Sequence, residues 1–293
     1  ALRLSFRRPF EVEALLGFLG ARAVAGVEEY GTGTYRRTLR LPHGGGMVAL
    51  RDGGGHIAAH LQLDDWRDLA PAVQRCRRLL DLDADPTAVD SVLGADPILA
   101  PLVATRPGLR VPGAVEGAEV AVRAIVGQQV SVVGARTLTG ELVRRLGKPL
   151  TAAEGTITHQ FPEPAALADS DPSSLGLPVA RGRALVGLAR SVEAGDLALD
   201  PGADREEATR SLLDQPGIGR WTAGYVAMRA LGDPDVLLET DAGTRRACGR
   251  LGLPRDPQLL TAHAERWRPW RSYALQHLWA SLAPAPRPKE TNA

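Results

Sequence analysis

The chain has 293 residues, of which 44% are hydrophobic and 24% charged, a balance that is typical of a globular protein with one to three domains. Its formal net charge of +1 excludes the strong overall basic field that would by itself indicate a nucleic-acid partner. No apolar run approaches the roughly 18 residues that span a bilayer. Two cysteines, Cys76 and Cys248, are too few for a disulfide framework or a four-thiolate metal site, and they indicate a reducing interior.

Residues 1–90 are expected to form an α+β domain with a small antiparallel sheet. Four stretches are typical of strands, at 2–6, 35–41, 47–51 and 56–63. The glycine clusters at 44–46 and 53–55 separate the last three stretches and are expected to be hairpin turns. Helices are predicted over 12–19 and 64–82.

From about residue 91 the pattern becomes helical. The longest periodic stretch, 119–146, is interrupted by the sequence Gly-Gln-Gln-Val-Ser at 127–131. Residues 147–180 are rich in Pro, Ala, Ser and Asp and are expected to be loop and short helical turns. Further helices are predicted over 181–194, 206–213, 220–231, 242–251, 259–267 and 272–282. The Pro-rich polar tail at 284–293 is predicted to be disordered.

A glycine-rich turn at 216–219 lies between two of the predicted helices. Such a turn presents backbone N–H groups at a helix N-terminus, which suits one phosphate, and its glycines let an anion approach closely. Trp221 and Tyr225 are spaced i, i+4, so both rings share one helix face. A single carboxylate, Asp241, opens the next helix. Together these features predict an enzyme that holds a DNA backbone and works on a flipped base.

The order of these motifs resembles the helix-hairpin-helix (HhH-GPD) DNA glycosylases of base-excision repair, and within them the AlkA-type 3-methyladenine-DNA glycosylase II branch. The resemblance rests on PGIGRWTA, then MRALGDPDV, then Asp241, then RWRPWRSYALQHLW. PGIG alone is a weak signal, whereas the ordered set is specific. The resemblance implies a TBP-like antiparallel sheet domain at 1–90, followed by an all-α glycosylase core at 91–283 with the hairpin at 206–231.

By this resemblance, Asp241 matches the catalytic aspartate of the family. An alkylated purine already carries positive charge, so the enzyme needs an anion that stabilises the oxocarbenium-like sugar and positions water. The alternative, that Asp241 only caps a helix, is compatible with catalysis. Asp233 and Asp235 are the runners-up, and their alternative role is loop solvation.

Three aromatic residues are candidates for stacking on a cationic base, Trp221, Tyr225 and Trp279, although each could instead belong to the core. The resemblance places Gln128 and Gln129 at the DNA minor groove, where one fills the gap left by the flipped base. The alternative is that both glutamines cap a helix break.

The DNA phosphate is expected at the hairpin turn, held by backbone N–H groups and the residues Gly217, Ile218, Gly219 and Thr222. No cofactor and no metal bound by side chains are expected. The resemblance does imply a monovalent cation at the carbonyl groups of Leu213, Gln215 and Ile218.

Covalent amine catalysis is not expected. In relatives that use a Schiff base, a lysine stands where this chain has Trp221, and the iron–sulfur branch requires four cysteines. We therefore expect a monofunctional hydrolase that excises alkylated bases, chiefly 3-methyladenine and 7-methylguanine, and leaves an abasic site without lyase activity. A glycosylase of other base specificity and a non-catalytic hairpin module that binds DNA are the alternatives.

The expected partner is damaged double-stranded DNA, with no membrane contact. We expect a monomer in the bacterial cytoplasm. The chain starts at Ala1 rather than methionine, and some relatives are fused behind a methyl-transferring repair module. The sequence therefore leaves open that the chain is the C-terminal part of a longer repair polypeptide.

Overall fold

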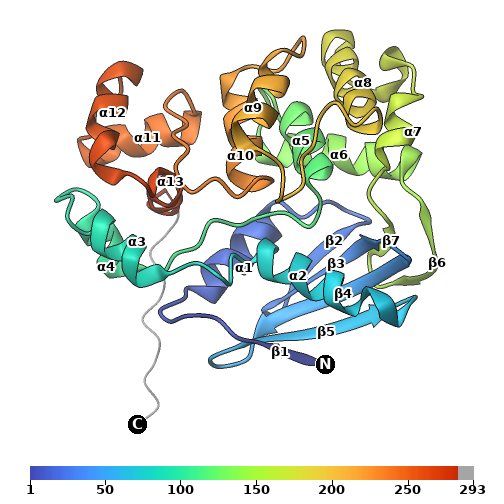
Figure 1. The fold of residues 1–293 in the computed structure, drawn as a ribbon, viewed down its shortest axis with the longest axis horizontal. Coiled ribbons are helices and arrows are strands. Elements are labelled where there is room, and N and C mark those ends of the chain that lie inside the picture. Colours follow the sequence, from blue (N-terminus) through green and yellow to red (C-terminus); the bar gives the residue numbers. More distant parts are fainter. Residues whose placement is uncertain (283–293) are drawn as a thin grey trace.

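An antiparallel sheet opens the chain and a body of helices follows it in the computed structural model, which describes residues 1–282 (Figure 1). The predicted α+β fold class is confirmed. The tail at 284–293, predicted to be disordered, lies outside the described residues. Within residues 1–282, no helix combines the length and hydrophobicity that a membrane span requires.

The sheet has the strand order β1-β5-β4-β3-β2, and every neighbouring pair is antiparallel. Its strands are β1 (Leu2–Leu4), β2 (Glu28–Gly31), β3 (Thr34–Leu41), β4 (Gly44–Asp52) and β5 (Ile57–Leu63). Helices α1 (Val12–Ala21) and α2 (Leu69–Leu79) pack against it. Tyr35 and Leu39 of β3 are fully buried with Val48 of β4, because alternate residues of a strand point to the same face.

The turn between β3 and β4 consists of Pro42 and His43, so the prediction that glycines 44–46 form this turn is wrong. These glycines belong to β4. A Cβ atom on Gly46 would lie 2.7 Å from the carbonyl oxygen of Gln62, so the close approach of β5 requires glycine there. The second cluster, 53–55, does separate β4 from β5. Strand β2, with the sequence Glu-Glu-Tyr-Gly, lacks hydrophobic alternation and is missing from the sequence prediction.

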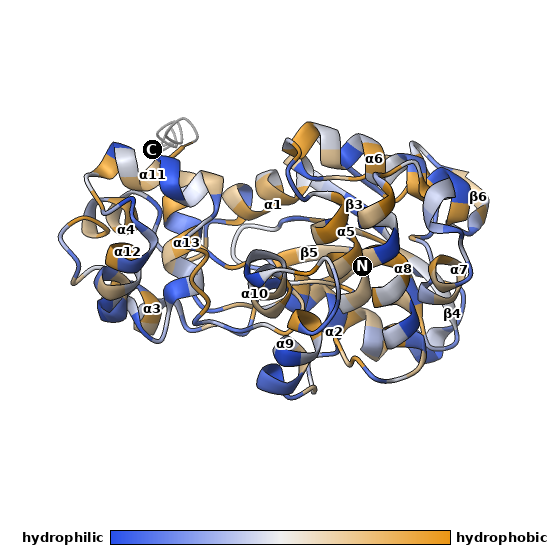
Figure 2. Cartoon of the chain, turned by 90° about the horizontal axis from the view of Figure 1, so that it is seen from above, coloured by the Kyte–Doolittle hydropathy of each residue, from blue (hydrophilic) through white to orange (hydrophobic). Residues whose placement is uncertain are grey.

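The helices form two groups with separate hydrophobic cores. The first group is α5 (Gly117–Val126), α6 (Val132–Leu146), α7 (Pro164–Ala168), α8 (Val179–Glu193), α9 (Arg205–Leu213) and α10 (Arg220–Arg229). The second is α3 (Pro86–Leu93), α4 (Ala100–Thr105), α11 (Ala242–Leu251), α12 (Pro257–Ala264) and α13 (Arg271–Ala280). Figures 1 and 2 show the second group to one side of the sheet and the first group. The predicted domain boundary at residue 90 falls inside α3, which packs with the C-terminal helices.

A short hairpin of strands β6 (Pro149–Glu154) and β7 (Ile157–His159) leaves the helical body and returns to the sheet. The hydroxyl of Thr38 on β3 donates to the carbonyl of His159, and the N–H of Thr158 donates to the carbonyl of Gly26 at 2.8 Å. Loop and short helical turns are predicted here from the sequence. That prediction is wrong for these residues, because contacts with distant parts of the chain determine the extended backbone.

Four charged side chains, three of them buried and one, Arg123, partly exposed, join the sheet to α5. Arg37 on β3 contacts Glu28 at 3.0 Å and Glu119 at 2.6 Å, and Arg123 contacts the same two carboxylates at 3.0 and 2.9 Å. Burial alone would raise the pKa of Glu28, but the charges of Arg123 and Arg37 outweigh it and lower the pKa to about 2. Arg123 also donates to the carbonyl of Arg22 at 2.6 Å, which ties the end of α1 to α5.

His277 on α13 provides a test of this packing, because it is 1% exposed and neither ring nitrogen has a partner among residues 1–282. Burial lowers its pKa to about 4, with a smaller contribution from Arg106. The unfolded chain binds a proton at this site below pH 6.5 and the folded chain does not. Relative to a His277→Leu variant, the wild type should therefore lose about 2 kcal/mol of stability between pH 7 and pH 5.

Urea unfolding of both proteins at several pH values measures this difference, and the comparison cancels the contributions of all other titrating groups. A difference in stability that does not change with pH would show that His277 is protonated, or solvated, in the folded protein.

Candidate active site

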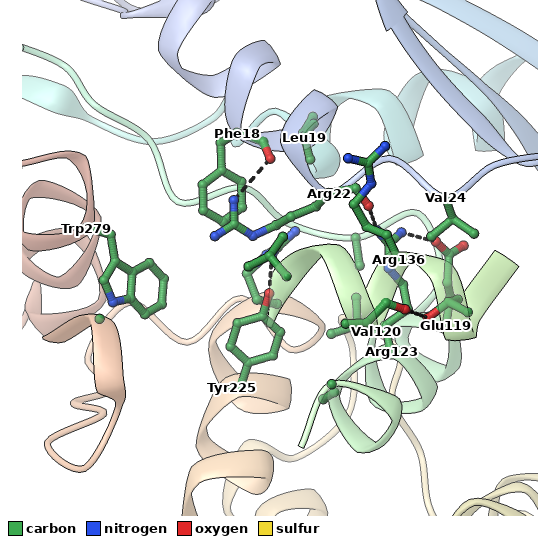
Figure 3. Close-up of a pocket in the computed structure, with 18 of the residues that line it drawn as sticks. Phe18, Leu19, Arg22, Val24, Glu119, Val120, Arg123, Arg136, Tyr225 and Trp279 are labelled. Atoms are coloured by element: carbon green, nitrogen blue, oxygen red, sulfur yellow. Dashed lines mark hydrogen bonds and ion pairs between the residues drawn. The ribbon is translucent and has the colours of Figure 1, made fainter. Parts of the chain in front are cut away.

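A pocket of about 550 Å³ lies where α1, α5, α10 and the C-terminal helices meet. Phe18 of α1 and Arg22, the C-cap of α1, line one side, and Tyr225 of α10 and Trp279 of α13 line others (Figure 3). Asp241, which precedes α11, also lines the pocket. Side chains from both ends of the chain therefore share one cavity.

Asp241 is held by hydrogen bonds from two indole rings. One carboxylate oxygen accepts from Nε1 of Trp221 at 3.0 Å, and the other accepts from Nε1 of Trp279 at 3.0 Å. The second oxygen also accepts from the backbone N–H of Thr244 at 2.8 Å, so Asp241 is the N-cap of α11. Among the described residues, no arginine or lysine forms an ion pair with this carboxylate. The cap and the indoles fix the carboxylate while its charge stays available to the pocket.

The two runners-up lie elsewhere. Asp235 is bound by Arg268 at 2.7 Å and by Arg271 at 2.7 Å, so its charge is neutralised by two guanidinium groups. Asp233 accepts the backbone N–H of Asp235 at 2.8 Å, which is a turn contact. Through these contacts both carboxylates stabilise the loop.

The aromatic candidates gather at the pocket. The rings of Trp221 and Tyr225 are stacked, with centroids 5.3 Å apart and an interplanar angle of 13°. Trp279 lies across the cavity from Tyr225 in Figure 3. Burial would raise the pKa of the Tyr225 phenol, but nearby arginine charges and a hydrogen bond from Arg229 at 2.7 Å lower it.

The hairpin turn connects α9 to α10. Gly217 has φ +89°, a conformation that favours glycine, and Ile218 is buried. Gly219 is the N-cap of α10 and offers no side chain to the first N–H groups of the helix. A Cβ atom on Gly219 would meet nothing within 4 Å, so the turn is open on this side. An anion can therefore approach the N-terminus of α10.

Gln128 and Gln129 have different surroundings. Nε2 of Gln128 donates to the carbonyl of Gly217 and to Oγ1 of Thr222, both at 3.0 Å, so Gln128 joins the helix break to the hairpin. Gln129 is exposed, with φ +58°, beside the partly exposed Val130. The N-cap of α6 is Ser131, whose hydroxyl accepts the N–H of Gly134 at 3.1 Å. A serine, and neither glutamine, therefore caps the helix that follows the break.

Phe18 and Arg22 are pocket residues that are missing from the sequence prediction. No site residue was predicted within residues 1–90, yet α1 supplies part of the pocket wall. The one available signal is an arginine directly after the apolar run LLGFLGA. An arginine on such a helix is most often a surface residue, so only the tertiary structure gives it a role.

Within residues 1–282, no group of three or more His, Cys, Asp or Glu side chains is arranged to hold a metal ion. Cys76 and Cys248 are both buried, and burial raises the pKa of each thiol. Neither cysteine lines the pocket. Metal chemistry therefore has no side-chain ligand set among the described residues.

Comparison with known proteins agrees with this geometry. Residues 1–116 match the family model described as AlkA N-terminal domain. The chain is 39% identical over 285 residues to the DNA-3-methyladenine glycosylase 2 of Escherichia coli, covering 94% of this chain and 95% of that protein. The chain belongs to the AlkA family of DNA glycosylases.

One further relative and one solved structure extend the comparison. A Mycobacterium tuberculosis protein described as a probable bifunctional transcriptional activator/DNA repair enzyme AlkA is 50% identical over 282 residues. The match covers 96% of this chain and 57% of that protein, so the chain spans little more than half the length of this AlkA relative. The solved 3-methyladenine DNA-glycosylase of Archaeoglobus fulgidus shares the fold, with TM-score 0.84, 23% identity, and coverage of 96% of this chain and 98% of that one.

The two glycines of the hairpin should respond differently to alanine. A Cβ atom on Gly217 would lie 2.8 Å from Cβ of Ala184, in a left-handed backbone conformation, so Gly217→Ala should cost about 3 kcal/mol of stability. Gly219→Ala, with open space and φ −98°, should change stability by less than about 1 kcal/mol. Urea unfolding measures both, and equal losses would contradict the different surroundings of the two glycines.

Proposed function

We propose that this chain is a monofunctional DNA glycosylase that hydrolyses the N-glycosidic bond of alkylated bases in duplex DNA, as a step of base-excision repair. The observation that carries the proposal is the carboxylate of Asp241, which faces an aromatic pocket and is oriented by Trp221 and Trp279 without a cationic partner. A volume of about 550 Å³ is within the range of small-molecule sites and accommodates a purine.

The base reaches such a pocket only after it leaves the helical stack. Departure of an alkylated base leaves positive charge on the sugar, and the anion of Asp241 stabilises that charge and orients the attacking water. Because the alkyl group has already made the base a good leaving group, no acid is needed on the base side. Trp221 and Trp279 hold the anion in place during the reaction.

The aromatic wall favours 3-methyladenine and 7-methylguanine over normal bases. A methylated purine is electron-poor and cationic, and the faces of Trp221, Tyr225 and Trp279 attract positive charge. Ala242 also lines the pocket, so the wall near Asp241 is formed by a small side chain and leaves space for an added methyl group.

The DNA backbone binds at the hairpin. A side chain from the break between α5 and α6 fills the position that the flipped base leaves. The N–H groups at the start of α10, around Gly217, Ile218, Gly219 and Thr222, receive one phosphate. The exposed Gln129 enters the gap that the flipped base leaves, while Gln128 keeps the break aligned with the hairpin.

A monovalent cation would be held by carbonyl groups of Leu213, Gln215 and Ile218 in this turn. The surroundings fit such an ion, because the side-chain oxygen of Gln215 is buried and has no donor among the described residues. The ion would supply positive charge beside the bound phosphate. The proposed catalytic chemistry does not pass through it.

A covalent lyase step is not part of the proposal. Trp221 occupies the position where a Schiff-base enzyme would carry its amine, and Lys148, between α6 and β6, is exposed rather than part of the pocket wall. The product is therefore free base and an abasic site. The proposed enzyme is a monomer that acts on damaged double-stranded DNA.

Asp241→Asn tests the catalytic assignment. Asparagine preserves the helix cap and removes the charge, so release of 3-methyladenine and 7-methylguanine from methylated duplex DNA should fall on the order of 100-fold to 1,000-fold. Chromatography of the released bases under single-turnover conditions measures this rate.

Asp256→Asn is the matched control. Asp256 caps α12 through the N–H groups of Gln258 and Leu259, both at 3.0 Å, and it lies outside the pocket. The control should release bases at the wild-type rate. Wild-type release by Asp241→Asn would reject the catalytic role, and no release by the wild type itself would reject the proposed function.

Gly219→Ala tests the phosphate site separately from folding. The added methyl group occupies the open side of the turn, where the phosphate would approach, so affinity for a duplex with an abasic site should fall about 10-fold. Fluorescence anisotropy at fixed salt measures the affinity. Unchanged affinity in a stably folded variant would place the DNA backbone elsewhere.

A further inference from the structure

Three side chains of α10 follow one another at intervals of four residues and share one face of the helix, Trp221, Tyr225 and Arg229. The first two belong to the aromatic wall of the pocket, and Arg229 also lines the cavity. Arg229 is only 7% exposed, and within residues 1–282 it has no carboxylate partner. Burial of an unpaired cation is costly unless its N–H groups find acceptors, so the acceptors of this guanidinium are informative.

Two of these acceptors are backbone carbonyls of the segment 107–116, which leads from α4 to α5. Nε of Arg229 donates to the carbonyl of Pro112, and Nη2 donates to the carbonyl of Gly113 at 3.1 Å. The segment is itself fixed against the end of α2, because the N–H of Gly113 donates to the carbonyl of Leu79 at 3.1 Å. Parts of the fold outside the aromatic wall therefore hold the guanidinium in place.

The third acceptor is the hydroxyl of Tyr225, to which Nη1 of Arg229 donates at 2.7 Å (Figure 3). The ring of Tyr225 is stacked on Trp221, and Nε1 of Trp221 donates to the carboxylate of Asp241 at 3.0 Å. Contacts thus run without a break from the segment 107–116 through Arg229 and the two rings to the catalytic candidate. A tyrosine that borders a cavity has space to change its rotamer, and the hydrogen bond at its hydroxyl restricts that freedom.

We propose that Arg229 is a positioning residue that fixes the ring of Tyr225 against Trp221 and thereby aligns the base and Asp241 for cleavage. It acts through Tyr225, since its three nitrogens are committed to two carbonyls and the phenol. Such alignment matters because a misplacement of about 1 Å can lower a rate about 100-fold. This inference rests on the proposed function and adds to it a residue that needs no contact of its own with the base.

A purely structural role of Arg229 has a different consequence. A cation in the last turn of a helix stabilises that helix through its dipole, whatever the orientation of Tyr225. Loss of this stability lowers the fraction of enzyme that is folded, but it does not change the rate in the folded molecules. With enzyme in excess over DNA, a structural role therefore raises the half-saturating enzyme concentration, and a positioning role lowers the rate at saturation.

The test is single-turnover release of 7-methylguanine from methylated duplex DNA, measured over a range of enzyme concentrations. Arg229→Met removes the donors and keeps an unbranched side chain. The saturating rate should fall about 10-fold or more, and the half-saturating concentration should not change, because the hairpin binds the DNA. Arg229→Lys keeps the charge and one donor group and should retain part of the rate. A wild-type saturating rate in Arg229→Met would overturn the proposal, whatever happens to half-saturation.

Tyr225→Phe tests the same link from its other end. This substitution removes the acceptor, while the stacked ring and the contacts of Arg229 with the segment 107–116 remain. The two single variants and the double variant should show similar falls in saturating rate, because each breaks the same hydrogen bond. A wild-type rate in Tyr225→Phe, or effects that multiply in the double variant, would overturn the role of Arg229. Tyr225→Phe remains decisive where Arg229→Met fails to fold.

Arg205→Met is the matched control. Arg205 donates to the carbonyls of Leu231 and Gly232, both at 3.2 Å, just beyond the end of α10, and it does not line the pocket. The control should keep the wild-type saturating rate. An equal fall in the control would show that general loosening of this end of α10 causes the effect, and would overturn the positioning role. Release of no base by the wild type would overturn the proposed function, and the inference with it.

Discussion

The pocket depends on the largely buried ion cluster of Glu28, Arg37, Glu119 and Arg123, which joins the sheet to α5. Its charges balance, so the cluster adds no net charge to the interior. Removing one member would leave a buried charge without a partner, which costs about 3–5 kcal/mol. The cluster also holds the carbonyl of Arg22, so it fixes the part of α1 that borders the cavity.

A second constraint acts on Asp241. Its backbone starts α11, its side chain caps that helix, and both oxygens accept indole N–H groups from different helices, α10 and α13. Each contact is ordinary, but together they connect the two helical groups at the catalytic candidate. The carboxylate is thus part of the structure that holds the pocket together, and its neutral donors leave its negative charge uncompensated.

The features that could be predicted from the sequence are those carried by short segments of the chain. The spacing of Trp221 and Tyr225 predicts a shared helix face, and the structure has two stacked rings there. The turn at 216–219 and Asp241 could be predicted because their chemistry depends on residues within a short segment. Neither the place of Phe18 in the pocket nor the strand β7 (Ile157–His159) could be predicted in this way. Their roles arise from contacts with residues far away in the chain, and no periodicity in their own segments records those contacts.

Charged side chains of opposite sign line the pocket in addition to its aromatic walls. Asp241, an anion, and Arg22, a cation without a carboxylate partner among residues 1–282, both line the pocket, and Arg22 lies over the ring of Phe18. Aromatic faces attract any electron-poor base and distinguish poorly among bases of that kind. A hydrogen-bond donor distinguishes an oxygen from an amino group, because an unmet buried donor is costly. Under the proposed function, the aromatic faces would therefore attract damaged bases in general, and polar groups of the same cavity would distinguish among them.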